Sequence, residues 1–218
     1  MVNQKKLEST QKLLAETKEA VFSKRERWND YILNAAVKFY KYNFEDQLLI
    51  HAQRPDATAC AEYSMWNSLG RYVRRGNSGV SLLTNVDGRP GLRYVFDISD
   101  TGGKEIPPIW SYRGDLHNIV RDSICRSFRL DECDSVNRAI KNAVQKATFT
   151  WLSNHNYIDE HAPELLNNLI VQNSIIVVLE RIGLRGKLPP AFNGIEMLDY
   201  DELALLGNGI NRISGLIL

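Results

Sequence analysis

The sequence has few cysteines, and their spacing excludes two common uses of this residue. Cys60, Cys125 and Cys133 form neither an even set nor a C-x-x-C pair, which argues against both a disulfide framework and a zinc knuckle. We therefore expect reduced thiols that are mostly buried.

Features for export or membrane insertion are also missing. The first 20 residues are polar, carry four lysines and have no apolar h-region, so no signal peptide is visible. The most apolar run, residues 165–179, is interrupted by amide side chains and a serine and is too short to span a bilayer comfortably. We expect a cytoplasmic protein with no membrane partner.

The common catalytic motifs are absent as well. There is no Walker A sequence, no G-x-G-x-x-G and no G-x-S-x-G nucleophile elbow. His155 and His161 bracket two acidic residues, but they are six positions apart, whereas the histidines of H-E-x-x-H must be four apart to meet on one helix face. We interpret them as loop and helix-cap residues. The sequence therefore predicts a non-catalytic protein with no cofactor and no metal site.

The chain's near-neutral charge conceals two unequal parts. Its 218 residues carry 27 lysines and arginines against 26 acidic residues, and 44% are hydrophobic, which excludes a disordered chain and a bulk polycation. Residues 1–113 hold 17 basic and 13 acidic residues, a net charge of +4, whereas residues 114–218 hold 10 and 13, a net charge of −3. The first part also has 14 of the 20 aromatic residues, so it can both attract anions and stack flat rings.

Residues 1–113 show helical patterns followed by strand patterns. We predict helices over 4–22, from a capping box at Ser23–Glu26 onward, over 45–52, and over 59–69 with a stop at Gly70. A short strand is predicted near Tyr72. The β-rich runs 80–84 and 92–98 then flank a loop dense in turn-forming residues, 85–91, and predict a hairpin.

Beyond a break at residues 101–103 and 107–108 the pattern is helical to the end. We predict helices over 116–130, 136–151 and 165–182, with Pro163 at a first helical position, and two short pieces, 201–206 and 210–218, split by Gly207-Asn-Gly209. The fold class is therefore α+β: N-terminal helices packed on a small antiparallel sheet in residues 1–113, then an all-α domain, 114–218, as a protein-interaction surface. The boundary is expected near residues 101–114.

The densest basic feature is the run Arg71-Tyr-Val-Arg-Arg75, which precedes Gly76-Asn-Ser-Gly79. Three guanidinium groups around one aromatic ring, next to glycines that let backbone amides approach an anion, suit phosphate contacts with base stacking. A solvated strand end would carry the same residues, so the prediction depends on whether the fold brings other basic groups nearby. These groups are the basic helix face formed by Arg25, Arg27, Lys38 and Lys41, together with Arg54 and Arg93.

A nucleic acid is thus the predicted ligand, and aromatic residues next to basic ones are its predicted stacking partners. Of the candidate rings, Tyr40, Tyr42 and Tyr72 are predicted to be exposed, while Trp28, Phe39 and Trp66 are predicted core residues. The full set of predicted nucleic-acid-binding residues is Arg25, Arg27, Lys38, Lys41, Tyr42, Gln53, Arg54, Arg71, Tyr72, Arg74, Arg75 and Arg93.

One long stretch has a family-specific pattern: residues 36–59, then Trp66, Gly70-Arg71, Arg75-Gly76, Gly79 and residues 94–101. It resembles the ArdC-like N-terminal domain of antirestriction proteins, which also stands at the front of very large helicase and methylase proteins of integrative conjugative elements. The second half resembles the helical segment that follows this domain in the conjugative-element proteins, most clearly at residues 205–214.

The resemblance implies single-stranded DNA binding and protection of mobile DNA against the defences of a bacterial host cell. At matching positions it implies binding roles for Gln47, Gln53, Arg54, Arg71 and Arg75, although the two glutamines could equally brace the helices. The metalloprotease-like H-E-x-x-H domain of ArdC-type proteins and the helicase and methylase motifs of the large relatives are absent here.

Two functional hypotheses follow. The first is a non-catalytic anti-defence protein, antirestriction or anti-CRISPR, that binds single-stranded DNA, a guide RNA, or a host restriction or CRISPR nuclease; its acidic second half could meet a basic nucleic-acid channel. The second is a single-stranded-DNA docking module of a conjugative-element helicase or methylase. A third hypothesis is a protein-interaction domain whose basic patch has no role in binding.

Overall fold

The computed structural model describes residues 4–105, 114–155 and 163–218. Its strands are β1 (Cys60–Glu62), β2 (Arg71–Val73), β3 (Val80–Val86), β4 (Arg89–Asp97) and β5 (Thr101–Gly103). Its helices are α1 (Gln4–Ser23), α2 (Arg25–Asp30), the π-helix η1 (Tyr31–Ala36), α3 (Phe44–Gln53), α4 (Tyr63–Ser68), the 3-10 helices η2 (Ile98–Asp100), η3 (Gly114–Leu116) and η4 (Ile195–Met197), α5 (His117–Phe128), α6 (Val136–Asn154), α7 (Pro163–Arg181) and α8 (Tyr200–Ile217).

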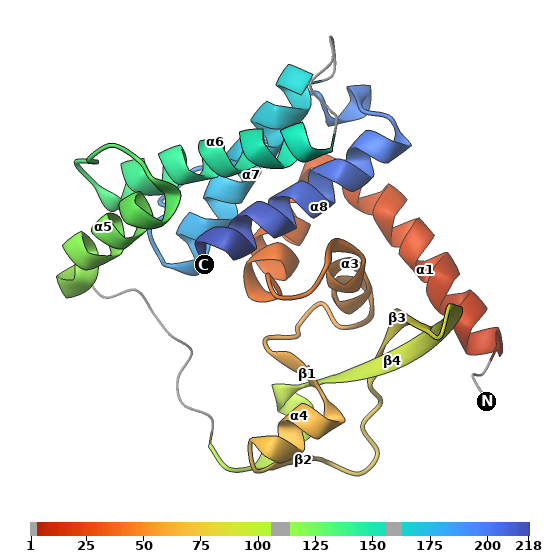
Figure 1. Cartoon of the computed structure of the whole chain (residues 1–218). Helices are drawn as coiled ribbons and strands as arrows, with labels where there is room; N and C mark the ends of the chain where they lie inside the picture. The colour runs from red at the N-terminus through yellow and green to blue at the C-terminus, as the bar shows by residue number, and fades with distance from the viewer. Residues whose placement is uncertain (1–3, 106–113, 156–162) are drawn as a thin grey trace.

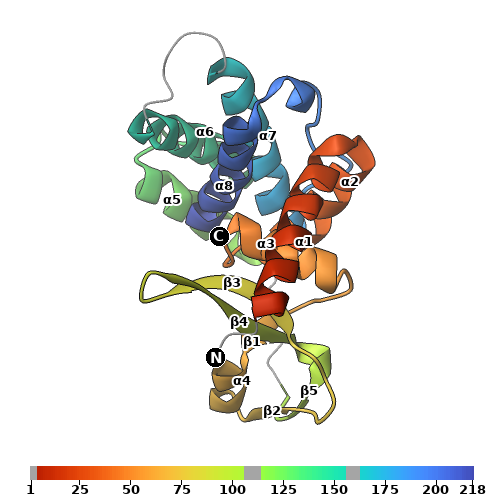
Figure 2. The same cartoon turned by 90° about the vertical axis from the view of Figure 1, so that its right-hand side faces the viewer.

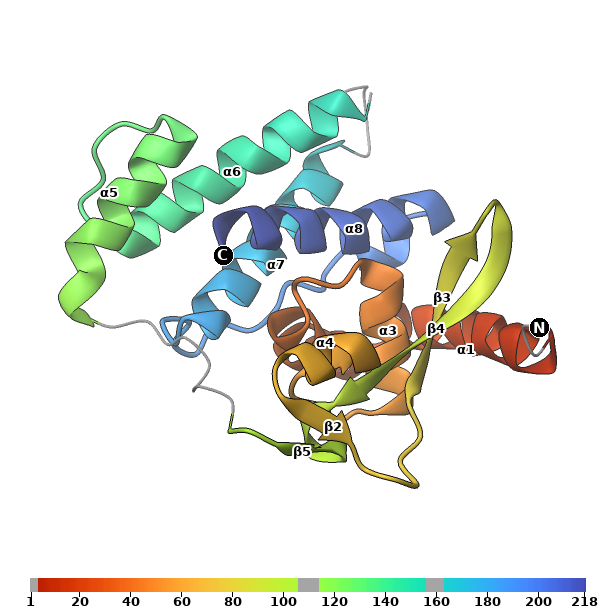
Figure 3. The same ribbon diagram turned by 60° about the horizontal axis from the view of Figure 1, so that its bottom comes forward.

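The predicted α+β class is confirmed. Helices α5 to α8 gather on one side of the molecule, α1 to α3 lie in the middle, and the strands lie on the opposite side (Figure 1). The strands form an antiparallel sheet of order β1-β4-β3 and a separate antiparallel pair, β2-β5. The β3-β4 hairpin crosses α1 (Figure 3), and the hydroxyls of Thr10 and Ser81 are 3.1 Å apart.

The second helix begins differently from the prediction. Ser23 is the last residue of α1, and its hydroxyl donates to the carbonyl of Ala20 at 2.8 Å. Lys24 takes the N-cap position without a side-chain hydrogen bond, so the predicted capping box is wrong. Trp28 and Phe39 are buried, as predicted for core residues, and so are the residues at helical spacing between them.

Part of the predicted helix 59–69 is strand. Residues 60–62 form β1 and pair with β4, with Cys60 opposite Asp97. The carboxylate of Asp97 accepts hydrogen bonds from the backbone N–H groups of Thr58 and Ala59 at 2.7 and 2.9 Å, which holds this segment extended. Helix α4 starts only at residue 63, and Gly70 follows its end with φ +74°, as predicted.

The hairpin is longer and its turn tighter than predicted. Asp87 and Gly88 have φ values of 52° and 78°, the left-handed pair that a two-residue hairpin turn requires. Most of the expected loop therefore belongs to the strands, and Asn85 pairs with Pro90. Pro90 is tolerated because β1 pairs only with residues 95–97 of β4, so the proline lies where β4 has no second neighbour. The predicted break at 101–103 is also wrong, since these residues form β5.

Helix α8 is continuous, although the sequence predicted two pieces. A side-chain carbon at Gly207 would lie 2.5 Å from the ring of Phe44, and one at Gly209 would lie 2.8 Å from Ile170. The glycines therefore permit close packing of α8 on α3 and α7 rather than ending the helix.

One hydrophobic core joins the described parts of residues 1–113 and 114–218. Trp28, on α2, is buried and donates through its indole N–H to the carbonyl of Ala191 at 2.7 Å. Gln47 of α3 donates to Asn211 of α8 at 2.9 Å. The predicted boundary lies largely in residues 106–113, outside the described ranges.

Candidate nucleic-acid interface

The five strands β1 to β5 and helix α4 form a lobe on the opposite side of the molecule from α5 to α8 (Figure 2). We call this region, residues 54–104, the sheet lobe. It carries seven of the basic residues of the chain, among them the run that begins at Arg71.

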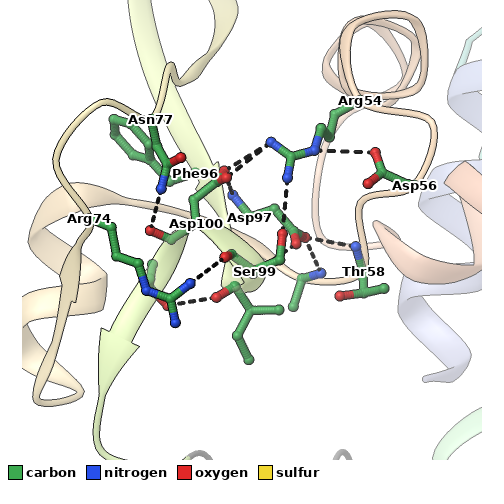
Figure 4. A network of polar contacts seen from close by, with 12 residues as sticks. Arg54, Asp56, Thr58, Arg74, Asn77, Phe96, Asp97, Ser99 and Asp100 are labelled. Carbon is green, nitrogen blue, oxygen red and sulfur yellow. Dashed lines mark hydrogen bonds and ion pairs between the residues drawn. The ribbon is translucent and has the colours of Figure 1, made fainter.

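A tight turn at residues 97–100 organises the sheet lobe (Figure 4). Asp97 and Asp100 form a reciprocal capping box, and both carboxylates are buried. Burial acts to raise the pKa of Asp97, but hydrogen bonds from the backbone N–H groups of Ser99, Ala59 and Thr58 prevail and hold it below its ordinary value. The turn is therefore a charged, hydrogen-bonded clip between β4, β5 and the segment before β1.

Arg54 is occupied by this clip. Its Nη1 donates to the two oxygens of Asp100 at 3.1 and 3.2 Å, its Nε to Asp56 at 3.2 Å, and its Nη2 to the hydroxyl of Ser99 at 3.0 Å (Figure 4). All three nitrogens thus have partners, and two carboxylates neutralise the charge. The geometry favours a bracing role for this residue over the predicted nucleic-acid contact.

Arg71, Arg74 and Arg75 differ from Arg54 because none of them forms an ion pair with a carboxylate in the described part of the chain. Arg71 donates to the hydroxyl and carbonyl of Thr101 at 2.8 and 3.2 Å and to the carbonyl of Lys104. Arg74 is exposed and donates to the carbonyl of Ser99 at 3.2 Å; Arg75 is exposed. The acceptors of Arg71 and Arg74 are neutral, so they do not cancel the charge of these side chains.

Exposed aromatic rings accompany these arginines. Tyr72 is 58% exposed, and its ring lies over Gly102, where a side-chain carbon would be 3.0 Å from it. Tyr63 on α4 and Tyr94 on β4 are 55% and 44% exposed. Tyr94 was not among the predicted binding residues. Side chains alternate along a strand, so Arg93, Val95 and Asp97 share one face of β4 and Tyr94 lies on the other face.

Two other predicted residues, Tyr42 and Arg93, have structural partners. The hydroxyl of Tyr42 donates to the carbonyl of Cys60 at 2.8 Å, and burial raises its pKa. Arg93 pairs with the buried Asp46 at 2.5 Å and with Glu62 at 3.4 Å. Burial raises the pKa of Asp46 even though Arg93 opposes this.

Both glutamines of the stretch 36–59 have partners within the fold, which favours the alternative bracing role. Gln47 is fully buried, accepts from the hydroxyl of Tyr31 at 2.7 Å and donates to the carbonyl of Phe39 at 3.0 Å. Gln53 donates to the carbonyl of Ser81 and accepts from its backbone N–H, at 2.9 and 3.0 Å.

The predicted basic helix face does not join the β2 arginines. Arg25 lies over the ring of Phe192, and Lys41 lies 5.8 Å from the ring centre of Tyr40. Arg27 lines a cleft of about 370 Å³ between α1, α2 and α3. Lys38 is half-buried, and its positive charge contributes to lowering the pKa of His51. Arg25 and Lys41 thus lie near aromatic rings, whereas Arg27 and Lys38 both act on His51.

The same cleft holds a contact between a histidine and an aspartate. His51 Nε2 lies 3.3 Å from the Oδ2 of Asp30. Burial lowers the pKa of His51, Asp30 opposes this, and the charges of Lys38 and Arg27 add to the lowering. A cleft with both signs of charge is a poor match for a phosphate chain.

No group of histidine, cysteine, aspartate or glutamate within residues 4–105, 114–155 and 163–218 could hold a metal ion. In the same ranges, no helix has the length and apolar content needed to cross a bilayer. All three cysteines are free; Cys133 is buried, and Cys60 and Cys125 are half-buried. His155 is the C-cap residue of α6, and His161 lies outside the described residues.

Comparisons with models of protein families, with curated proteins and with solved structures find no match to this chain. The resemblance to the ArdC-like domain therefore stays a prediction.

Proposed function

We propose that the chain binds single-stranded nucleic acid through the sheet lobe. Arg71, Arg74 and Arg75 would contact successive phosphates, and the exposed ring of Tyr72 would stack on a base. The observation that carries this proposal is the set of three guanidinium groups without carboxylate partners in the described residues, placed beside a tyrosine that is 58% exposed.

The acidic residues of the sheet lobe support this assignment. Asp97 and Asp100 are buried, and Asp100 and Asp56 are paired with Arg54. Glu62 faces Arg93. Because most of the negative charge is already compensated, an approaching strand would meet mainly the arginines on and after β2.

We further propose that this binding serves a non-catalytic anti-defence protein, antirestriction or anti-CRISPR, of a mobile genetic element in the bacterial cytoplasm. The resemblance of residues 36–101 to the ArdC-like domain supports this setting, and so does the acidic helical half as a surface for a restriction or CRISPR nuclease. The docking module of a conjugative helicase or methylase would bind single strands in the same way but would not inhibit a nuclease.

The test is the salt dependence of binding to a labelled single-stranded oligonucleotide, measured by fluorescence anisotropy. Three phosphate contacts predict that the logarithm of the affinity falls with the logarithm of salt concentration with a slope of about −2. No binding at low salt to either a DNA or an RNA strand would refute the proposal. Inhibition of a purified nuclease by the chain separates the anti-defence role from the docking role.

A further inference from the structure

A second concave site lies on the helices, away from the sheet lobe. A cleft of about 540 Å³ opens between the start of α2, helix α7 and the connector of residues 188–193. This volume falls within the range of small-molecule sites.

The lining of this cleft has an unusual chemical balance. It includes no carboxylate, one guanidinium group from Arg25, and three side-chain amides, from Asn168, Gln172 and Asn193. The remaining lining is apolar and includes leucines, two prolines and Phe192. Such a site suits a flat, uncharged ring that has hydrogen-bonding groups on its edge.

Two of the amides are available to a ligand. Asn168 and Gln172 lie four positions apart on α7, so both project on the same side of the helix. Both are exposed, and neither side chain forms a hydrogen bond with any residue that the structure describes. A carboxamide offers a donor and an acceptor side by side, which is the pattern that pairs with a nucleobase edge.

Arg25 and Phe192 supply a stacking surface. The guanidinium carbon of Arg25 lies 5.4 Å from the ring centre of Phe192, and its Nη2 donates to the side-chain oxygen of Asn193. A guanidinium plane held against a phenyl ring can stack on a base and can also meet a phosphate.

The connector that forms one side of the cleft is held rigidly. The buried Asn173 both donates to the carbonyl of Ala191 and accepts from its N–H, each at 3.0 Å, and Trp28 donates to the same carbonyl at 2.7 Å. Gly194 has φ +90°, and a side-chain carbon there would lie 2.6 Å from Leu165 in the lining. The cleft is therefore preformed, which lowers the entropic cost of binding.

We propose that this cleft binds one nucleobase, held by the amides of Asn168 and Gln172 and stacked near Arg25 and Phe192. That the base comes from a strand on the sheet lobe rests on the proposed function. The affinity of the cleft for a free nucleotide does not.

The test is titration of the full chain with the four nucleoside 5′-monophosphates, followed by calorimetry and by NMR chemical shifts. Gln172→Leu should weaken the binding of the preferred nucleotide by about threefold to tenfold, because one amide is lost at nearly constant volume. Asn168→Leu should act in the same direction. The matched control is Gln145→Leu, another exposed glutamine in a long helix of the same half, which should leave the affinity unchanged.

The outcomes separate this proposal from the proposed function. Absence of binding, equal effects of Gln172→Leu and Gln145→Leu, or equally tight binding of ribose 5-phosphate would each overturn the nucleobase site. Arg74→Ala with Arg75→Ala should weaken strand binding while the mononucleotide affinity stays constant. If Gln172→Leu also weakens binding of an oligonucleotide, the base comes from a strand; if only the mononucleotide is affected, the cleft serves free nucleotides.

Discussion

Asp97 shows how a single buried carboxylate can hold the candidate interface in shape. It is 2% exposed and accepts hydrogen bonds from three backbone N–H groups, those of Thr58, Ala59 and Ser99. Asp97→Asn replaces one acceptor oxygen by a donor that faces these groups. We expect a loss of about 1 to 3 kcal/mol in the free energy of unfolding, measured in urea at pH 7.

The control for this change is Asp56→Asn, because Asp56 has a side chain that is 77% exposed; its effect should stay below about 1 kcal/mol. Because the pKa of Asp97 is lowered in the folded state, its contribution is present above the unfolded pKa of about 3.9 and is lost as the pH falls through the folded value. The difference between wild type and Asp97→Asn should therefore shrink in acid. A difference that is constant with pH would refute this account.

His51 makes the second prediction at the residue scale. Its pKa is lowered in the folded state, so below about pH 6.5 the unfolded chain binds the proton more readily, and stability falls as the pH drops through this window. His51→Gln should flatten the stability profile below about pH 6.5. Urea midpoints at several pH values would check this, and an unchanged slope in the variant would contradict it.

Individual residue roles could be predicted only where they depend on neighbours in sequence. Arg54 and Arg74 looked equivalent in the sequence, but Arg54 meets Asp100, 46 positions away, whereas Arg74 meets only a carbonyl among the described residues. No local pattern contains that pairing. In the same way, the sequence did not indicate that Asn168 and Gln172 line a cleft. They are polar residues in an apolar helix, and the connector that completes the cleft comes 16 or more positions later.

At the scale of elements, α8 offers a matched pair of glycines. Gly207→Ala places a carbon 2.5 Å from the ring of Phe44, and the cost of overpacking should exceed the gain in helix propensity, for a net loss of about 1 to 3 kcal/mol. At Gly215 the nearest atom, the carbonyl oxygen of Tyr40, would be 3.6 Å away, so Gly215→Ala should be neutral or stabilise by up to about 1 kcal/mol.

Thermal unfolding of the two variants would check this prediction, since a shift of the same sign in both would refute the packing role of Gly207. The pair also shows which elements the sequence could predict. Apolar spacing found α1, α3, α6 and α7. It could not tell a glycine that ends a helix from one that packs it, since this depends on the ring opposite.

At the scale of the whole molecule, the basic part (residues 1–113) and the acidic part (residues 114–218) share one hydrophobic core in the described residues. The buried cluster runs from α2 and α3 into α6, α7 and α8, and Gln47 links α3 to Asn211 of α8. We expect the full chain to unfold in a single transition, with coincident curves from tryptophan fluorescence and far-ultraviolet circular dichroism. Two separated transitions would contradict the shared core.

The division of charge was visible in the sequence, but the shared core was not, because it depends on contacts between residues more than 150 positions apart. The two candidate sites lie in different surroundings on this single unit: the sheet lobe carries the arginines of β2, and the helices carry the amide-lined cleft. A nucleic-acid strand bound at the sheet lobe could place a base in the amide-lined cleft only if the same strand contacts both sites.

The most direct measurement is the affinity of Arg74→Ala with Arg75→Ala for a labelled single strand over a range of salt concentrations. Loss of two phosphate contacts should weaken binding and reduce the magnitude of the salt slope by about 1.4. The matched control, Arg138→Ala with Lys141→Ala, removes two exposed charges from α6 and should leave both quantities unchanged. Equal slopes for wild type and the Arg74/Arg75 variant would contradict the assignment of strand binding to the sheet lobe.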